Sequence, residues 1–150
     1  NAAKETGLRV IVQSSWSKLD VASEPLCQNI GPCPHDWLLP LCIAVIHHGG
    51  AGTTAAGLRY GLPTCVCPFF ADQFMWAEMV HRAGVGPSPC PINKLTVEIL
   101  AERLRELADP EVKAKAVELS KKMEEENGVQ GGLQHFLDEL PRDNYLCNVS

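Results

Sequence analysis

The sequence predicts an α/β protein in which helices flank a parallel β-sheet. Short apolar runs alternate with amphipathic or charged segments, which is typical of strands joined by helical crossovers. The runs interpreted as strands are residues 8–14, 26–30, 42–46 and 64–68, with 85–87 as a short last strand or extended segment. Polar or glycine-rich loops follow these strands, so they should meet at one edge of the sheet, where open α/β sheets bind ligands.

Segments with helical periodicity or helix-end signals separate these strands. The expected helices are residues 1–6 (the end of a helix), 35–39, 53–60, 74–83, 97–108, 111–126 and 133–140. The run 42–46 is almost wholly apolar, which predicts a strand covered by helices on both faces. Trp76, Met79 and Val80 follow helical spacing and are expected in the core. We expect one domain over residues 1–140 and a C-terminal tail over 141–150.

Composition excludes several classes of protein. The 150 residues are 45% hydrophobic and carry a net charge of −5, without a strongly basic stretch, which argues against nucleic-acid binding. No apolar run is long enough to span a bilayer, and no signal-peptide pattern begins the chain. The seven cysteines include no Cys-x-x-Cys pair, so we expect mostly reduced core residues in a cytosolic protein and no metal site. The first residue is Asn1, so we expect a fragment or a processed product.

The glycine-rich segment 47–54 lies between an expected strand and an expected helix. Glycines let the backbone approach a ligand closely, and the free N–H groups of a helix start favour an anion. Gly52 and Thr53 could donate to a phosphate, and His48 could add a donor or a charge. The segment is neither a Walker loop nor a dinucleotide fingerprint. A structural turn, with one buried and one exposed histidine, is the alternative.

Three other features are candidates for chemistry. Asp72 and Gln73 place a carboxylate beside an amide at a strand end, where both can bind sugar hydroxyls, although Asp72 could equally cap a helix. Trp16 follows the first strand and is either a ligand contact or a loop anchor. Four histidines are acid–base candidates by residue type only. These are His35, His47, His48 and His81. A metal site built from His47, His48, Cys65 and Cys67 matches no zinc spacing.

Four motifs occur in order at residues 34–38, 47–58, 68–73 and 80–87. Together they closely resemble the C-terminal half of sterol 3-beta-glucosyltransferases, which are UDP-sugar enzymes of the two-domain GT-B architecture. The resemblance runs from about residue 10 to 140. It implies a Rossmann-like parallel sheet flanked by helices, and a UDP-sugar donor-binding domain over residues 1–140.

The resemblance also implies roles for individual residues. The residues that would bind UDP-glucose are Cys33 and His35 at the uracil and ribose, His48, Ala51, Gly52 and Thr53 at the diphosphate, Asp72 and Gln73 at the glucose, and Ser14 and Trp16 near the nucleotide. Cys33 would act through its backbone. Related plant enzymes stack a tryptophan on the uracil and hold the ribose with a glutamate. Pro32 and Ala56 stand at those positions here, so these two contacts should be absent or supplied differently.

The activity implied is transfer of glucose from UDP-glucose to the 3-hydroxyl of a sterol, with inversion and without a further cofactor. The acceptor pocket and the catalytic base belong to the family's N-terminal half, so this chain should contain no catalytic residue and be inactive alone. The full-length enzyme is expected in the cytoplasm, with possible peripheral membrane association. The alternative is a separate donor-binding subunit, or an inactive nucleotide-sugar-binding module, that works through a partner chain. A metal or redox protein is a weaker third reading.

Overall fold

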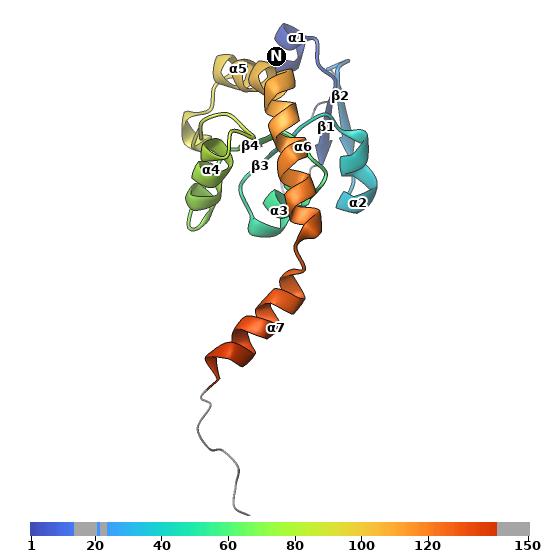
Figure 1. Cartoon of the computed structure of the whole chain (residues 1–150). Helices are drawn as coiled ribbons and strands as arrows, with labels where there is room; N and C mark the ends of the chain where they lie inside the picture. Colours follow the sequence, from blue (N-terminus) through green and yellow to red (C-terminus); the bar gives the residue numbers. More distant parts are fainter. Residues whose placement is uncertain (14–20, 22–23, 141–150) are drawn as a thin grey trace, which may run out of the picture.

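Two pairs of parallel strands form the β-structure of the computed structural model, which describes residues 1–13, 21 and 24–140 (Figure 1). β1 (Val10–Gln13) pairs with β2 (Cys27–Ile30), and β3 (Val45–His47) pairs with β4 (Thr64–Val66). Among the described residues, ladder hydrogen bonds join strands only within each pair. The predicted α/β class with parallel strands flanked by helices is confirmed, with the strands arranged as two units.

Helices flank the strands, and those that pack on them contact mainly β3 and β4. The helices are α1 (Ala2–Thr6), α2 (His35–Leu38), η1 (Leu39–Leu41), α3 (Ala51–Arg59), α4 (Gln73–Arg82), η2 (Ile92–Lys94), α5 (Val97–Leu107), α6 (Pro110–Glu125) and α7 (Gly128–Glu139). In Figure 1, α4 and α2 lie on opposite sides of the body, and α6 crosses in front of the strands. α6 packs against α3, and α5 packs against α1.

The core is built around β4, whose three residues are all buried. One face of this strand packs against helices α4 and α6, in a cluster of Val66, Ala77, Val80, Val85 and Ala116. On the other face, Cys65 and Cys67 form a second cluster with Leu107 of α5. Helices therefore cover both faces of β4, as expected for a strand of a parallel sheet.

β3 is shorter and more exposed than the sequence predicts. Pro40 lies in the 3-10 turn η1, which closes when the Cys42 N–H donates to the Leu39 carbonyl at 3.0 Å, so the strand begins only at Val45. Ile43 is 63% exposed and Ile46 is 37% exposed. The prediction that helices cover both faces is therefore wrong for this strand.

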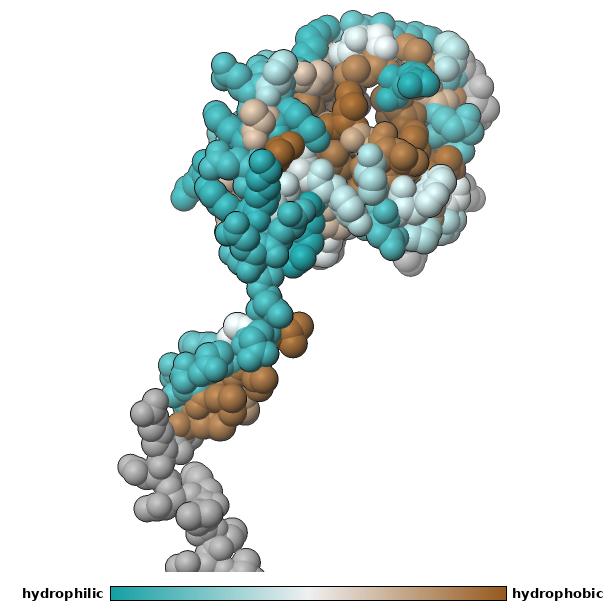
Figure 2. Space-filling view, turned by 45° about the vertical axis from the view of Figure 1, so that its right-hand side comes forward, coloured by the Kyte–Doolittle hydropathy of each residue, from teal (hydrophilic) through white to brown (hydrophobic). Residues whose placement is uncertain are grey.

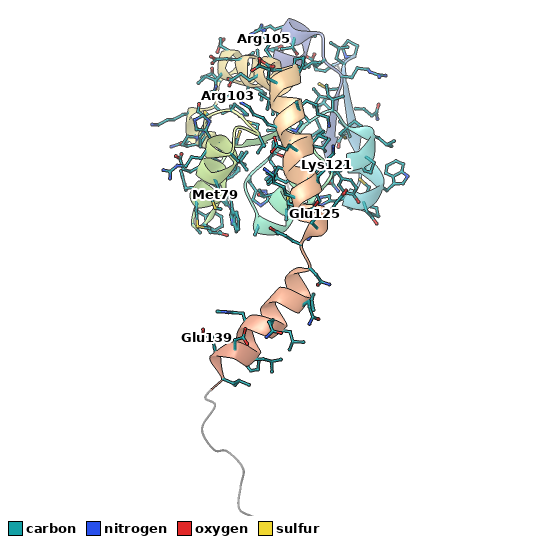
Figure 3. All side chains as sticks on the ribbon, viewed as in Figure 1. Met79, Arg103, Arg105, Lys121, Glu125 and Glu139 are labelled. Atoms are coloured by element: carbon teal, nitrogen blue, oxygen red, sulfur yellow. The ribbon has the colours of Figure 1, made fainter. Side chains whose placement is uncertain are left out.

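Residues 85–87 form no strand, although they lie against one. The Thr64 N–H at the start of β4 donates to the Val85 carbonyl at 2.9 Å. Val80 enters the core as predicted, whereas Met79 is 53% exposed. Figure 3 labels Met79 on α4. The core-facing side of α4 carries Gln73, Ala77 and Val80, and Met79 points away from it, so its core assignment is wrong.

α7 extends away from the body of the protein (Figure 1). It begins at Gly128, earlier than the predicted residue 133, because the Asn127 side chain accepts a hydrogen bond from the Gln130 N–H at 3.0 Å and caps the helix. No residue of α7 is buried, and Figure 2 shows its apolar side chains along one side. These exposed residues are Val129, Leu133, Phe136 and Leu137, and the C-cap residue Leu140 is exposed as well.

No helix in the described ranges has the length and apolar character needed to cross a membrane. Residues 141–150 lie outside the described part, so the boundary between a domain at 1–140 and a tail stays a prediction.

Candidate functional site

The loop between β3 and α3 is held tightly at Gly49. This glycine has a φ angle of +98°, which residues other than glycine rarely adopt. A Cβ there would lie 2.7 Å from Val66 Cγ1 and 3.1 Å from the Gln73 carbonyl oxygen. The Gly49 N–H donates to His47 Nδ1 at 2.9 Å. The loop therefore has one tightly packed path from β3 to α3.

α3 begins with backbone donors that no side chain caps in the described structure. Gly50 is the N-cap residue, and the first helical bond runs from the Thr54 N–H to its carbonyl at 2.9 Å. The N–H groups of Ala51, Gly52 and Thr53 precede that bond, so they are open to an anion at the positive end of the helix dipole. The two exposed residues of this trio, Ala51 and Gly52, place the cradle at the surface.

The glycine-rich loop and the start of α3 carry two pairs of neighbouring polar residues, and the members of each pair differ in exposure. His48 is exposed, and its Nε2 lies 2.9 Å from where a Cβ of Gly50 would stand, so its imidazole covers the start of α3. His47 is half-buried. Thr54 is buried and donates its hydroxyl to the Gly50 carbonyl at 2.9 Å, whereas Thr53 is half-buried. His48 and Thr53 are therefore the more exposed members of the two pairs.

Asp72 and Gln73 lie at the start of α4 in different environments. Gln73 is only 7% exposed, and its Oε1 accepts hydrogen bonds from the Phe69 and Phe70 N–H groups at 2.7 and 3.2 Å. Asp72 is exposed, and its Oδ2 accepts from Trp76 Nε1 at 2.9 Å. The Asp72 carboxylate makes no cap bond to α4, because it reaches along the helix to Trp76 instead. Asp72 is the N-cap residue of α4, as the alternative interpretation expected, but it caps through its backbone carbonyl, which accepts the Trp76 N–H at 3.1 Å.

The glycine-rich loop and the Asp72 loop meet at one edge of the strands. His47 and Val66 are register partners at the ends of β3 and β4, so both loops leave the sheet at the same edge. The close approach of Gly49 to Gln73 joins the loops directly. The predicted diphosphate and glucose residues are thus brought together.

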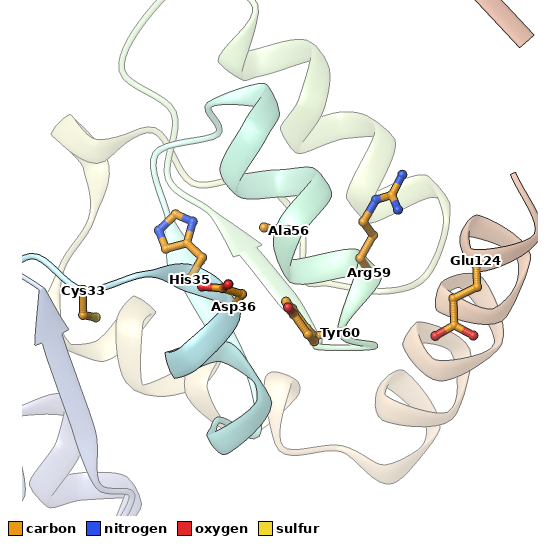
Figure 4. A pocket seen from close by; sticks show the side chains of 7 residues that line it. All are labelled: Cys33, His35, Asp36, Ala56, Arg59, Tyr60 and Glu124. Atoms are coloured by element: carbon orange, nitrogen blue, oxygen red, sulfur yellow. The ribbon is translucent and has the colours of Figure 1, made fainter. Parts of the chain in front are cut away.

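A pocket of about 660 Å³ opens along the side of α3 (Figure 4). It contains two predicted site residues, Cys33 and His35, opposite Ala56 on α3. The Cys33 carbonyl already accepts a hydrogen bond from Gln13 Nε2 at 3.3 Å. α3 therefore contributes to two parts of the candidate site. Its N-terminus follows the glycine-rich loop, and its side faces the loop that carries Cys33 and His35.

Sequence reasoning missed four residues that line this pocket. They are Asp36, Arg59, Tyr60 and Glu124. Arg59 and Tyr60 follow Ala56 at helical spacing, so the expected helix could have indicated them. No local signal indicates Glu124, which reaches the pocket from α6 through tertiary packing. Ser14 and Trp16 lie outside the described residues.

Residues 9–130 match the family described as erythromycin biosynthesis protein CIII-like, C-terminal domain. The chain belongs to this family. Two Arabidopsis thaliana proteins, sterol 3-beta-glucosyltransferases UGT80B1 and UGT80A2, are 45% and 44% identical to it over 141 and 145 residues. These matches cover 92% and 93% of this chain but only 23% and 22% of the two relatives, so the chain spans less than a quarter of their length. The resemblance to sterol 3-beta-glucosyltransferases is confirmed.

Solved glycosyltransferases share the fold of this CIII-like domain. The glycosyltransferase VinC in complex with dTDP matches with a TM-score of 0.76 and 26% identity, over 91% of this chain and 35% of that one. The glycotransferase of kitacinnamycin matches with a TM-score of 0.74 and 25% identity, over 89% and 35%. The assignment to the C-terminal part of a GT-B glycosyltransferase is confirmed.

Electrostatics in this CIII-like domain keep His47 neutral. Burial, followed by the nearby His48 and His35, lowers the pKa of His47 from its usual 6.5 to about 4. Metal ligands and thiols are a separate question. In the described part of the chain, no group of three or more histidine, cysteine or acidic side chains could hold a metal ion. The cysteines there are free thiols. Of these, Cys65, Cys67 and Cys90 are buried. The site therefore offers backbone donors, a carboxylate and an open pocket for binding.

Proposed function

We propose that this chain is the donor-binding portion of a glucosyltransferase that transfers glucose from UDP-glucose to the 3-hydroxyl of a sterol, with inversion. Its 45% identity to a plant protein named as a sterol 3-beta-glucosyltransferase supports the substrates. A nucleoside diphosphate, which is the UDP part of the donor, also suits the fold, since the structural relative VinC was solved with dTDP. No separate cofactor is needed, because UDP-glucose is itself the activated donor.

The observation that carries this proposal is the uncapped N-terminus of α3 between the pocket and Asp72. The diphosphate would lie on the N–H groups of Ala51, Gly52 and Thr53, under the His48 imidazole. The uridine would extend along α3 to Cys33 and His35. On the other side, glucose hydroxyls would donate to the Asp72 carboxylate, whose oxygens are at the surface. One helix would thus orient both ends of the donor.

Gln73 would contribute to this site mainly through structure. Its Oε1 holds the Phe69 and Phe70 N–H groups, which shapes the turn that presents Asp72. A direct contact to glucose would therefore have to come from the Nε2 donor of Gln73, which can pair with a hydroxyl oxygen.

The pocket also offers a replacement for the ribose contact that Ala56 cannot make. Asp36 and Glu124 line the same pocket as Ala56, and the carboxylates of both can accept hydrogen bonds from ribose hydroxyls (Figure 4). We favour Asp36, because it follows His35 directly and so lies beside the expected uracil and ribose position. Asp36→Ala should therefore weaken UDP binding more than Glu124→Ala.

In the reaction, the acceptor oxygen forms a bond to the anomeric carbon of glucose as the bond from that carbon to the diphosphate oxygen breaks. The leaving electron pair stays on UDP, so negative charge grows at the diphosphate. The α3 N–H groups and His48 would stabilise that charge, because they are in place before the reaction. We expect the acceptor pocket and the base that removes the acceptor proton to lie in the part of the relatives that this chain does not match. The chain alone should then bind donor without transferring glucose, and the full-length enzyme would act in the cytoplasm, peripherally at a membrane that supplies sterol.

Calorimetric titration with UDP-glucose and UDP tests the proposal. The parent chain should bind both ligands. His48→Ala should lose about 10- to 100-fold in affinity for both, since a hydrogen bond to a charged group contributes about 1.5–3 kcal/mol. Asp72→Ala should weaken UDP-glucose but leave UDP unchanged. His135→Ala and Asp138→Ala, which alter the same residue types on α7, are matched controls. A folded parent chain that binds neither ligand would refute the donor-site assignment.

A further inference from the structure

His47 is placed to organise the backbone of the glycine-rich loop. Its Nδ1 accepts the Gly49 N–H at 2.9 Å, and its backbone carbonyl accepts the Cys67 N–H of the neighbouring segment at 2.9 Å. Its Nε2 is buried and has no hydrogen-bond partner in the described structure. Because Nδ1 accepts a hydrogen bond, the imidazole must be neutral, with its proton on Nε2. The lowered pKa of His47 agrees with this state.

The bond from Gly49 to His47 fixes the path of the chain into α3. Gly49 has a positive φ and is enclosed on its other side by Val66 and by the Gln73 backbone. Gly50 follows in an extended conformation and begins the helix. A loop without this acceptor would have more conformations, and ordering them on ligand binding would cost affinity.

We propose that His47 is a positioning residue for the diphosphate loop: through Nδ1 it holds the Gly49 N–H, so that the donors at the start of α3 point at the ligand before it binds. This inference rests on the proposed function, because the loop is the proposed diphosphate cradle. It assigns the two adjacent histidines different roles. His48 contacts the ligand, and His47 supports the backbone that does.

Side-chain geometry supplies a matched pair of variants. In histidine, Nδ1 is two bonds from Cβ, and so is Oδ1 in asparagine. The Oε1 of glutamine is one bond farther out. His47→Asn therefore keeps an acceptor at the position of the histidine Nδ1. His47→Gln has the same amide group as asparagine, but its oxygen lies one bond too far from the backbone. His47→Leu would remove the side-chain acceptor altogether.

The experiment measures UDP affinity of the full chain by calorimetry, with folding checked by thermal unfolding. His47→Asn should stay within about threefold of the parent, and His47→Gln and His47→Leu should each lose about tenfold. Equal affinities for all variants, or equal losses for Asn and Gln, would overturn the proposal. If the parent itself fails to bind UDP, the proposed function fails instead.

A second measurement tests the inference without ligand and without any variant. Nitrogen-15 NMR of the parent imidazoles at pH 7 should show His47 with an unprotonated Nδ1 and a protonated Nε2. The Gly49 amide proton should exchange slowly with solvent. A His47 protonated on Nδ1, or a Gly49 amide that exchanges freely, would overturn the positioning role even if UDP binds.

Discussion

Replacing Gly49 with alanine should destabilise the protein strongly through two effects at one atom. The residue has φ +98°, and a left-handed conformation costs a non-glycine residue about 1–2 kcal/mol. The new Cβ would also lie 2.7 Å from Val66 Cγ1 and 3.1 Å from the Gln73 carbonyl. Such overpacking typically costs about 1–3 kcal/mol. We therefore expect the free energy of unfolding to fall by about 2–5 kcal/mol in total.

Gly52 provides the control for this substitution, three residues along the chain. Nothing lies within 4 Å of a Cβ built there, and the residue sits in the first turn of α3. Gly52→Ala should stabilise the fold by up to about 1 kcal/mol, because alanine favours helix. The same methyl group would occupy the space proposed for the diphosphate, so UDP affinity should fall while stability does not.

Urea denaturation followed by circular dichroism measures both variants. For a chain of this size, the loss in Gly49→Ala corresponds to a lower melting temperature by roughly 5–15 °C. If Gly49→Ala unfolds within 0.5 kcal/mol of the parent, as surface substitutions do, the tight packing of the loop against β4 and α4 is refuted.

The remaining predictions concern pH, a close backbone approach and a helix cap. The pKa of His47 is lowered to about 4 on folding, so acid favours the unfolded state. The free energy of unfolding should be highest above about pH 6.5 and should fall by roughly 3 kcal/mol by about pH 4. Urea titrations of the parent and of His47→Asn should therefore diverge between these two pH values. Gly86→Ala would place a Cβ 1.8 Å from the Thr64 carbonyl oxygen, so we expect a loss of about 3 kcal/mol or more, and a melting temperature unchanged within 2 °C would contradict it. The Thr96 side chain accepts from the Ile99 N–H at 3.3 Å, so Thr96→Ala should cost about 1 kcal/mol of unfolding free energy while Thr96→Ser retains the cap.

Sequence patterns predicted the elements of this fold because the relevant information is local. Thr96 and Gly84 mark helix ends, and the apolar run before Pro68 marks a buried strand. The late start of β3 was not predictable from hydrophobicity, since Cys42 looks like a strand residue but closes a 3-10 turn. Likewise, Met79 fits helical spacing, yet the packing partners of α4 decide which residues are covered.

The candidate site shows the same division. The glycine-rich loop and Asp72 stood out because glycine, hydroxyl and carboxylate residues follow strands. The internal role of Gln73 was hidden, because its partners are backbone N–H groups presented by a turn in which Ala71 has φ +55°. Glu124 could not be foreseen either, since it comes from α6, which the crossing of α3 and α6 brings to the pocket.

α7 should be much less stable than the body of the protein. A helix of 12 residues with no buried side chain, and with Gly131 and Gly132 in its middle, is marginal on its own in water. We expect it to open and close independently of the body, with a free energy close to zero. Within the described part of the chain, proteases should therefore cut first at residues 128–140, and a protein trimmed there should melt at the same temperature as the parent. The cooperative unfolding unit is then the part that carries the candidate site, and a thermal melt reports on that part alone.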